Sequence, residues 1–248
     1  MISAAEYTNQ GGREVNEDCC CLIIQNQRLC AAVADGLGGH GGGDVASSTA
    51  VDVVCEEWRR VQTVEREHLS SWFSEANAAI YAKHQDGLQM KTTLAVMICE
   101  ETKVQLAHVG DTRIYHFIDG RMQSMTFDHS VSQLAVLAGE ITQEQIRNHA
   151  DRNRLIRSLG KKDEVEVELS ESIDVSDGRH AFLLCTDGFW EYVLEEEMER
   201  LLCKAKHPDE WLDEMVKLLK KKASKGNDNY TAVAVWIFQN DVMGRENR

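Results

Sequence analysis

The order of short apolar segments constrains the fold most, because several strands follow one another and the helices come only in pairs. Apolar and alternating runs predict strands over 19–24, 29–34, 93–99, 103–109, 113–118, 164–169, 181–186 and 231–238. Apolar residues at helical spacing predict two pairs of helices, over 44–60 and 65–86 and over 195–205 and 208–223. A doubly wound parallel sheet needs a helix between successive strands. We therefore expect antiparallel sheets covered by helices, an α+β fold.

Nothing in the sequence divides the chain into parts. Pro208 is the only proline, and no linker rich in Ser, Gly or Pro interrupts the 248 residues. We expect one domain over 1–248. The opening MISAAEYTNQGG has no basic segment followed by an apolar one, and no apolar run approaches about 18 residues. These observations predict neither a signal peptide nor a membrane-spanning helix, and they favour a cytoplasmic protein.

The charge balance excludes some partners. A formal net charge of −14 opposes binding to nucleic acid or to an anionic membrane, because both require clustered Lys and Arg. The eight cysteines include no CxxC pair, so we expect neither a disulfide framework nor a zinc site. Cys19, Cys20 and Cys21 are consecutive in a predicted strand, which favours a role as small buried hydrophobic residues.

Acidic residues stand where predicted strands meet polar turns. They are Glu17, Asp18, Asp35, Asp111, Asp187 and Asp228. Each alone is explained as well by a turn or a helix cap. If the strand ends meet, the carboxylates share one cleft, and two charges about 4 Å apart repel by roughly 4 kcal/mol at an effective dielectric of about 20. Such a cluster needs cations, and a set of oxygen ligands favours Mg²⁺ or Mn²⁺ over zinc.

A basic side chain beside this cluster indicates phosphate. Arg13 lies four residues before Glu17, and its guanidinium suits a bidentate grip on a phosphate group. A surface arginine alone is explained as well by a structural role, but beside a cluster of carboxylates it indicates a phosphate substrate.

Eight motifs in order make the chain similar to the metal-dependent serine/threonine protein phosphatases of type 2C in their compact bacterial form. They are GREVNEDCC, VADGLGGHGGG, TTLAV, AHVGDTRIY, TFDHS, NRLIRSLG, LLCTDGFWEYV and DNYTAVAV, and they span nearly the whole chain. The resemblance implies a four-layer α-β-β-α sandwich, with two central antiparallel sheets between helix pairs and a metal cleft at one edge.

The resemblance also implies the metal ligands. Asp35 would bridge two Mn²⁺ or Mg²⁺ ions. The carbonyl of Gly36 and the carboxylate of Glu17 would complete the shell of one ion, and Asp187 and Asp228 would hold the other. These positions all fall within the quoted motifs.

Further roles follow from the same resemblance. Asp111 with Asp187 would hold a third, weaker ion, Asp18 would orient metal-bound water, and Arg13 would bind the substrate phosphate. The catalytic set is therefore Arg13, Asp18 and Asp35. A hydroxide that bridges the ions would attack the phosphorus of phosphoserine or phosphothreonine in a protein. The implied partners are phosphoproteins, namely a bacterial Ser/Thr kinase or its targets, and a monomer is expected.

Two other functions are consistent with the same sequence. One is a catalytically silent module that keeps the fold and binds a partner. The other is a hydrolase for small phosphate esters that uses the same site. The complete acidic set opposes the first, since a lost metal ligand would be its clearest sign.

Some positions depart from the family or are ambiguous. Leu37 stands where many eukaryotic members have a histidine proposed as general acid, so the proton donor is unassigned. His40 is expected to serve the turn, with a place near the leaving group as the alternative, and His129 is expected to be structural. Residues 131–152 occupy the place of the family's mobile flap, although a plain surface helix explains them equally well.

Overall fold

A computed structural model describes residues 1–38, 41–84 and 89–238. The strands in these ranges are β1 (Ile2–Asn9), β2 (Asp18–Gln25), β3 (Arg28–Leu37), β4 (Lys91–Thr92), β5 (Leu94–Glu100), β6 (Lys103–Val109), β7 (Arg113–Ile118), β8 (Arg121–Met125), β9 (Glu168–Leu169), β10 (Ile173–Asp174), β11 (Arg179–Cys185) and β12 (Tyr230–Phe238). The helices are α1 (Gly43–Arg60), α2 (Arg66–Ala82), α3 (Val131–Leu137), the 3-10 helix η1 (Gln143–Asn148), α4 (Asp187–Trp190), α5 (Glu195–Leu202) and α6 (Pro208–Lys222). None of these described helices is long and apolar enough to cross a membrane.

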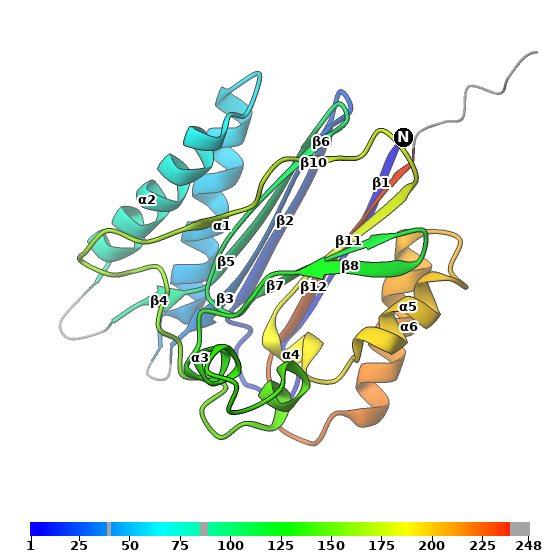
Figure 1. Ribbon diagram of the computed structural model, residues 1–248. Helices are drawn as coiled ribbons and strands as arrows, with labels where there is room; N and C mark the ends of the chain where they lie inside the picture. Colours follow the sequence, from blue (N-terminus) through cyan, green and yellow to red (C-terminus); the bar gives the residue numbers. More distant parts are fainter. Residues whose placement is uncertain (39–40, 85–88, 239–248) are drawn as a thin grey trace, which may run out of the picture.

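The strands form two sheets, and every described strand pair is antiparallel. One sheet has the order β1-β12-β11-β7-β8. The other has the order β10-β6-β5-β3-β2, with β4 beside β3 and β9 beside β6. Helices α1 and α2 lie on one side of the molecule and α5 and α6 on the other, with both sheets between them (Figure 1).

Alternation along the central strands builds the layers. In β3, Cys30 and Ala32 are buried against the helices α1 and α2, whereas Ala31 and Val33 are buried against the second sheet. A separate buried cluster joins the other sheet to α5 and α6 through side chains such as Trp211. Because alternate residues of a strand point to opposite faces, both faces of each sheet are covered. The expected α+β fold with its four-layer sandwich is confirmed.

The hairpin of β2 and β3 places two acidic residues side by side. Its turn consists of Asn26 and Gln27, with φ of 51° and 63°, the left-handed conformation that two-residue hairpin turns favour. The resulting register puts Asp18 directly opposite Asp35. Opposed residues in an antiparallel pair share one face, so the hairpin brings both side chains to the same end of the sheet.

The strands of the structure differ in places from those predicted, most clearly at β1 and at residues 164–169. Strand β1 was not predicted, because ISAAEYTN mixes small and polar residues; it is an edge strand, and β12 is its one partner among the described strands. The strand predicted over 164–169 is reduced to β9. Val165 and Val167 do pack against the core under α1 and α2, which explains the alternation, but burial of one face does not supply a backbone partner.

The cysteines also differ in part from expectation. Cys21 of β2 and Cys55 of α1 form a disulfide, so Cys21 is not simply a small hydrophobic residue. Cys19 and Cys20 are free and only partly buried. Cys30, in the adjacent strand, is free and fully buried.

Candidate active site

The acidic residues of distant segments converge at one end of the two sheets. Seven of the eight predicted site residues line a single cleft of about 410 Å³, and Asp18 lies beside Asp35 at its base. The seven are Arg13, Glu17, Asp35, Gly36, Asp111, Asp187 and Asp228. Strand ends from both sheets deliver them, since β3 carries Asp35 whereas β11 and β12 are flanked by Asp187 and Asp228.

Asp18 is buried behind the cleft, and one of its two carboxylate oxygens has a hydrogen-bond donor among the described residues. Its Oδ2 accepts a hydrogen bond of 2.9 Å from the hydroxyl of Thr186. Its Oδ1 is buried and has no hydrogen-bond partner among the described residues. A buried carboxylate oxygen without a donor is costly in a folded protein, so this atom calls for a water molecule or a cation as partner.

Two threonines hold the backbone of Asp35. The amide N–H of Asp35 donates to Oγ1 of Thr93 at 2.9 Å, and its carbonyl accepts from Oγ1 of Thr92 at 2.8 Å. The Thr93 hydroxyl is also 2.6 Å from that of Thr112, which follows Asp111. These bonds connect the segments of two acidic residues. Thr92 and Thr93 stand in the motif TTLAV, for which no role was predicted; two hydroxyl residues at the start of a strand were the available signal.

Asn229 fixes the loop that carries Arg13 and Glu17. Its side-chain oxygen accepts a hydrogen bond of 2.8 Å from the amide of Glu17, and its Nδ2 donates to the carbonyls of Gln10 and Val15. The loop is thus held to the start of β12, next to Asp228. Arg13 extends from it and donates to Oδ2 of Asp228 at 2.7 Å. Sequence reasoning missed Asn229, although it directly follows a predicted ligand.

The glycines after Asp35 let backbone and carboxylate approach closely. A Cβ on Gly38 would lie 2.5 Å from Oε1 of Glu17, and one on Gly43 would lie 2.7 Å from the same atom. Gly36 lies too close to the backbone of Gly43 for any side chain. These contacts seat the Glu17 carboxylate against the start of α1. Position 37 presents leucine at the cleft, and His40 lies outside the described residues.

The Asp111 segment is clamped from two sides. The indole N–H of Trp190 donates to the carbonyl of Asp111 at 3.0 Å. Arg113, two residues on, is buried and makes a bidentate pair with Asp128 at 2.8 Å for both bonds. Its guanidinium lies 3.6 Å from the centroid of the Trp190 ring, a cation-π contact. The segment is therefore held rigidly at the wall of the cleft.

The electrostatics of the cleft reflect crowded negative charge. Burial raises the pKa of Asp18 and of Asp187 to about 7, with further contributions from neighbouring carboxylates. The pKa values of Asp35 and Asp111 are raised well above the usual range, first by burial and then by surrounding carboxylates, including Asp187. Burial likewise raises the pKa of Glu17. Cations in the cleft would remove this penalty.

The residues present fit divalent metal ions with oxygen ligands. The cleft offers carboxylates and the Gly36 carbonyl, with neither His nor Cys among the described lining residues, which suits Mg²⁺ or Mn²⁺. The unpartnered Oδ1 of Asp18 adds an acceptor just behind the cleft.

The segment predicted as a flap borders the cleft. Within 131–152 the structure has α3 and η1, and Ser130 pairs with Leu155 immediately beyond it. Leu155 and Asn153 line the cleft themselves. Whether the segment acts as a lid stays a prediction.

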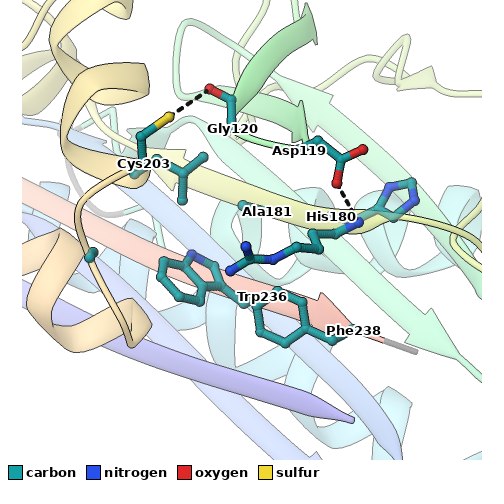
Figure 2. A pocket seen from close by; sticks show the side chains of 10 residues that line it. Asp119, Gly120, His180, Ala181, Cys203, Trp236 and Phe238 are labelled. Carbon is teal, nitrogen blue, oxygen red and sulfur yellow. Dashed lines mark hydrogen bonds between the residues drawn. The ribbon is translucent and has the colours of Figure 1, made fainter. Parts of the chain in front are cut away.

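A second hollow, whose lining is drawn in Figure 2, differs in chemistry. It lies at the ends of β11 and β12 that are farther from Asp187 and Asp228. Its wall includes Trp236 and Phe238 of β12, and Cys203 donates from its thiol to the carbonyl of Gly120 at 3.8 Å. Asp119 is the only carboxylate among its described lining residues. A hollow with one carboxylate cannot hold several cations, so the acidic cleft is the candidate active site.

A four-layer sandwich with an acidic, oxygen-lined cleft at one end of its two sheets is the architecture that the type 2C phosphatase motifs imply. The model of the family Protein phosphatase 2C matches residues 8–228. The serine/threonine phosphatase stp of Listeria innocua is 36% identical over 212 residues, covering 82% of each chain. The chain belongs to the protein phosphatase 2C family.

Solved structures agree with this membership. The serine/threonine phosphatase Stp1 from Staphylococcus aureus matches with a TM-score of 0.86 at 28% identity, covering 96% of each chain. The catalytic domain of the serine/threonine protein phosphatase PstP, solved with two manganese ions, matches with a TM-score of 0.79 at 26% identity, covering 94% of this chain and 97% of that one. The resemblance inferred from the motifs is confirmed.

Proposed function

We propose that this chain hydrolyses phosphoserine and phosphothreonine in proteins, using Mn²⁺ or Mg²⁺ in the acidic cleft, and that residues 1–248 act as one catalytic unit. The convergence of carboxylates from distant segments on one cleft, beside Arg13, carries the proposal. Similarity to phosphatases named for serine and threonine supports the substrate class.

The predicted residues are proposed to divide the work of the cleft among them. Asp35 belongs to β3 and would hold two ions. Gly36, Glu17, Asp187 and Asp228 line the same cleft as Asp35. Asp111 would help hold a third ion. When bound, the ions lower the pKa of water and neutralise phosphoryl oxygens.

The chain's own side chains perform the remaining steps. Arg13 is exposed at the rim, and its guanidinium has donors to spare beyond the one that binds Asp228, so it can bind two phosphoryl oxygens. The free Oδ1 of Asp18 can accept a hydrogen bond from water and orient it. Leu37 cannot donate a proton, so the departing alkoxide must take its proton from another donor.

A phosphopeptide assay with purified protein tests the proposal. With Mn²⁺, the protein should release phosphate from a phosphothreonine peptide, and a chelator should stop the release. Asp187→Asn should lower kcat/KM at least a hundredfold, because one ligand becomes a neutral amide. Asp119→Asn in the second hollow is the matched control and should leave the rate unchanged. Turnover that persists in the chelator would refute the metal mechanism.

The same assay separates the other two functions. Higher kcat/KM for a small phosphate ester than for every phosphopeptide would favour a metabolite hydrolase. Absence of turnover with any divalent ion, in protein that unfolds cooperatively, would favour a silent binding module. The proposed physiological partners are phosphoproteins, either a Ser/Thr kinase or its targets.

A further inference from the structure

His129 and Gly110 are joined by a reciprocal pair of hydrogen bonds next to the cleft. The amide of His129 donates to the carbonyl of Gly110 at 2.9 Å, and the amide of Gly110 donates to Nδ1 of the His129 ring at 3.1 Å. Both residues are buried, and Gly110 immediately precedes Asp111. We propose that His129 is a positioning residue, which holds the Gly110–Asp111 peptide so that the Asp111 carboxylate lines the metal cleft. This inference rests on the proposed function of Asp111 as a metal ligand.

The surroundings select one tautomer of His129. Because Nδ1 accepts from Gly110, the neutral ring carries its proton on Nε2, where it can donate to Oε2 of Glu168 at 3.2 Å. Arg157 also lies 3.1 Å from Nε2, but that contact would need the opposite tautomer and would give up both other bonds. The Arg157 guanidinium is instead held by Glu166 at 2.6 Å.

The ring of His129 is fixed in plane as well. It stacks on His108 with centroids 4.6 Å apart and an interplanar angle of 7°. His108 is anchored in turn, since its Nε2 lies 2.9 Å from the carbonyl of Phe127. The acceptor atom Nδ1 therefore has little freedom to leave the Gly110 amide.

A displacement of the Gly110 backbone would affect a second carboxylate, that of Asp35. Gly110 has φ of +107°, and a Cβ placed on it would lie 2.5 Å from Cγ2 of Thr93. Thr93 holds the amide of Asp35. The backbone that His129 fixes is thus packed directly against the residue that fixes Asp35, so loss of the Nδ1 acceptor should disturb two proposed ligands.

The same side chains lie close enough together for a metal site of their own, but their hydrogen bonds oppose it. Among the described residues, His108, His129 and Glu168 are the group whose ligand atoms all lie within 4.8 Å of one another. A ring nitrogen that bears a proton cannot bind a cation, and Nε2 of His129 bears one as long as Nδ1 accepts from Gly110. The cluster therefore serves the backbone of the Asp111 segment.

Two substitutions separate positioning from mere packing. His129→Asn places an oxygen near the position of Nδ1, so it can still accept from Gly110. His129→Gln places its polar group near the position of Nε2, so it keeps a partner for Glu168 and leaves the Gly110 amide without an acceptor. Both variants lose the stacked ring, so the temperature of thermal unfolding should fall by a similar amount in each.

Three measurements on the full chain test the proposal. Mn²⁺ binding without substrate, followed by calorimetry, should weaken tenfold or more in His129→Gln and by no more than about threefold in His129→Asn. Hydrogen exchange of the Gly110 amide should accelerate only in His129→Gln. In the phosphopeptide assay, the Mn²⁺ concentration for half-maximal rate should rise more in His129→Gln than in His129→Asn.

The outcomes are distinct from those of the proposed function. Equal Mn²⁺ affinity in the two variants, or a larger loss in His129→Asn, would overturn the positioning role. If the unaltered protein binds Mn²⁺ but hydrolyses no phosphopeptide, the proposed function fails, whereas the binding and exchange measurements still decide the role of His129.

Discussion

Asp18 of β2 and Asp35 of β3 lie directly opposite each other in an antiparallel pair, and the turn between them sets this register. Asn26 and Gln27 occupy the two turn positions at positive φ. A hairpin register is set by the length of its turn, and a slip of one residue sends side chains to the opposite face. The pairing of the two carboxylates therefore depends on two residues at the far end of the hairpin.

Gln27→Gly should stabilise the protein by about 0.5–1 kcal/mol, because glycine adopts φ of 63° without steric cost. The free energy of unfolding in urea measures the gain, and phosphatase activity should stay unchanged. Insertion of one glycine between Asn26 and Gln27 should instead weaken Mn²⁺ binding, since the end of β2 that carries Asp18, with the proposed ligand Glu17 next to it, would shift relative to Asp35. Unchanged Mn²⁺ affinity in the insertion variant would contradict this view of the register.

Thr93→Val should impair the metal cleft while leaving its shape intact. Valine keeps the volume that packs on Gly110 but cannot accept from the amide of Asp35, and an unsatisfied buried amide costs about 1–3 kcal/mol. We expect lower stability together with weaker Mn²⁺ binding in calorimetry. Thr93→Ser, which retains the hydroxyl, should bind Mn²⁺ nearly as well as the unaltered chain. Equal binding by both variants would show that this hydrogen bond does not hold Asp35.

Removal of divalent metal should lower the stability of the folded protein. Burial of Asp18, Asp35, Asp111 and Asp187 raises the pKa of each, so the folded cleft resists their ionisation when no cation is present. Saturating Mn²⁺ at about 100 times its Kd should add about 2.7 kcal/mol to the free energy of unfolding. Calorimetry with Mn²⁺ and with chelator measures the difference. Asp187→Asn should reduce the gain, and an identical Tm in both conditions would oppose metal binding in the folded state.

How far the sequence predicts the site depends on which contacts are local. Asp35, Asp111, Asp187 and Asp228 could be placed at strand ends because strand periodicity is a local property. The bonds from Thr93 to Asp35 and from Asn229 to Glu17 join residues far apart in the chain, so no local pattern reveals them.

The helices and strands likewise differ in whether neighbouring residues or distant partners determine them. The helices over 44–60 and 208–223 follow from apolar spacing and agree closely with α1 and α6. Strand β1 depends on its partner β12 more than on its own residues, and alternation at 164–169 indicates buried valines without a paired backbone. Sequence patterns report burial well, and they report pairing only where the partner is near in the chain.

Acid should destabilise the protein through His116, which lies outside the cleft. Its Nε2 lies 2.9 Å from Nδ1 of His180, whose own Nε2 is 2.7 Å from the carbonyl of Asp177, so the Nε2–H of His180 donates to that carbonyl and the Nε2–H of His116 donates to Nδ1 of His180. Burial lowers the pKa of His116 to about 4. A histidine in the unfolded chain has a pKa of about 6.5, so the unfolded state binds the proton before the folded state does. The stability that the neutral ring contributes is therefore lost as the pH falls from about 6.5 to about 4. We expect a loss of about 2 kcal/mol in the free energy of urea unfolding over this range.

The variant His116→Gln is the control, because glutamine keeps a donor for His180 and does not titrate. Its free energy of unfolding should fall less over the same pH interval. Parallel pH profiles for the two proteins would refute the assignment to His116.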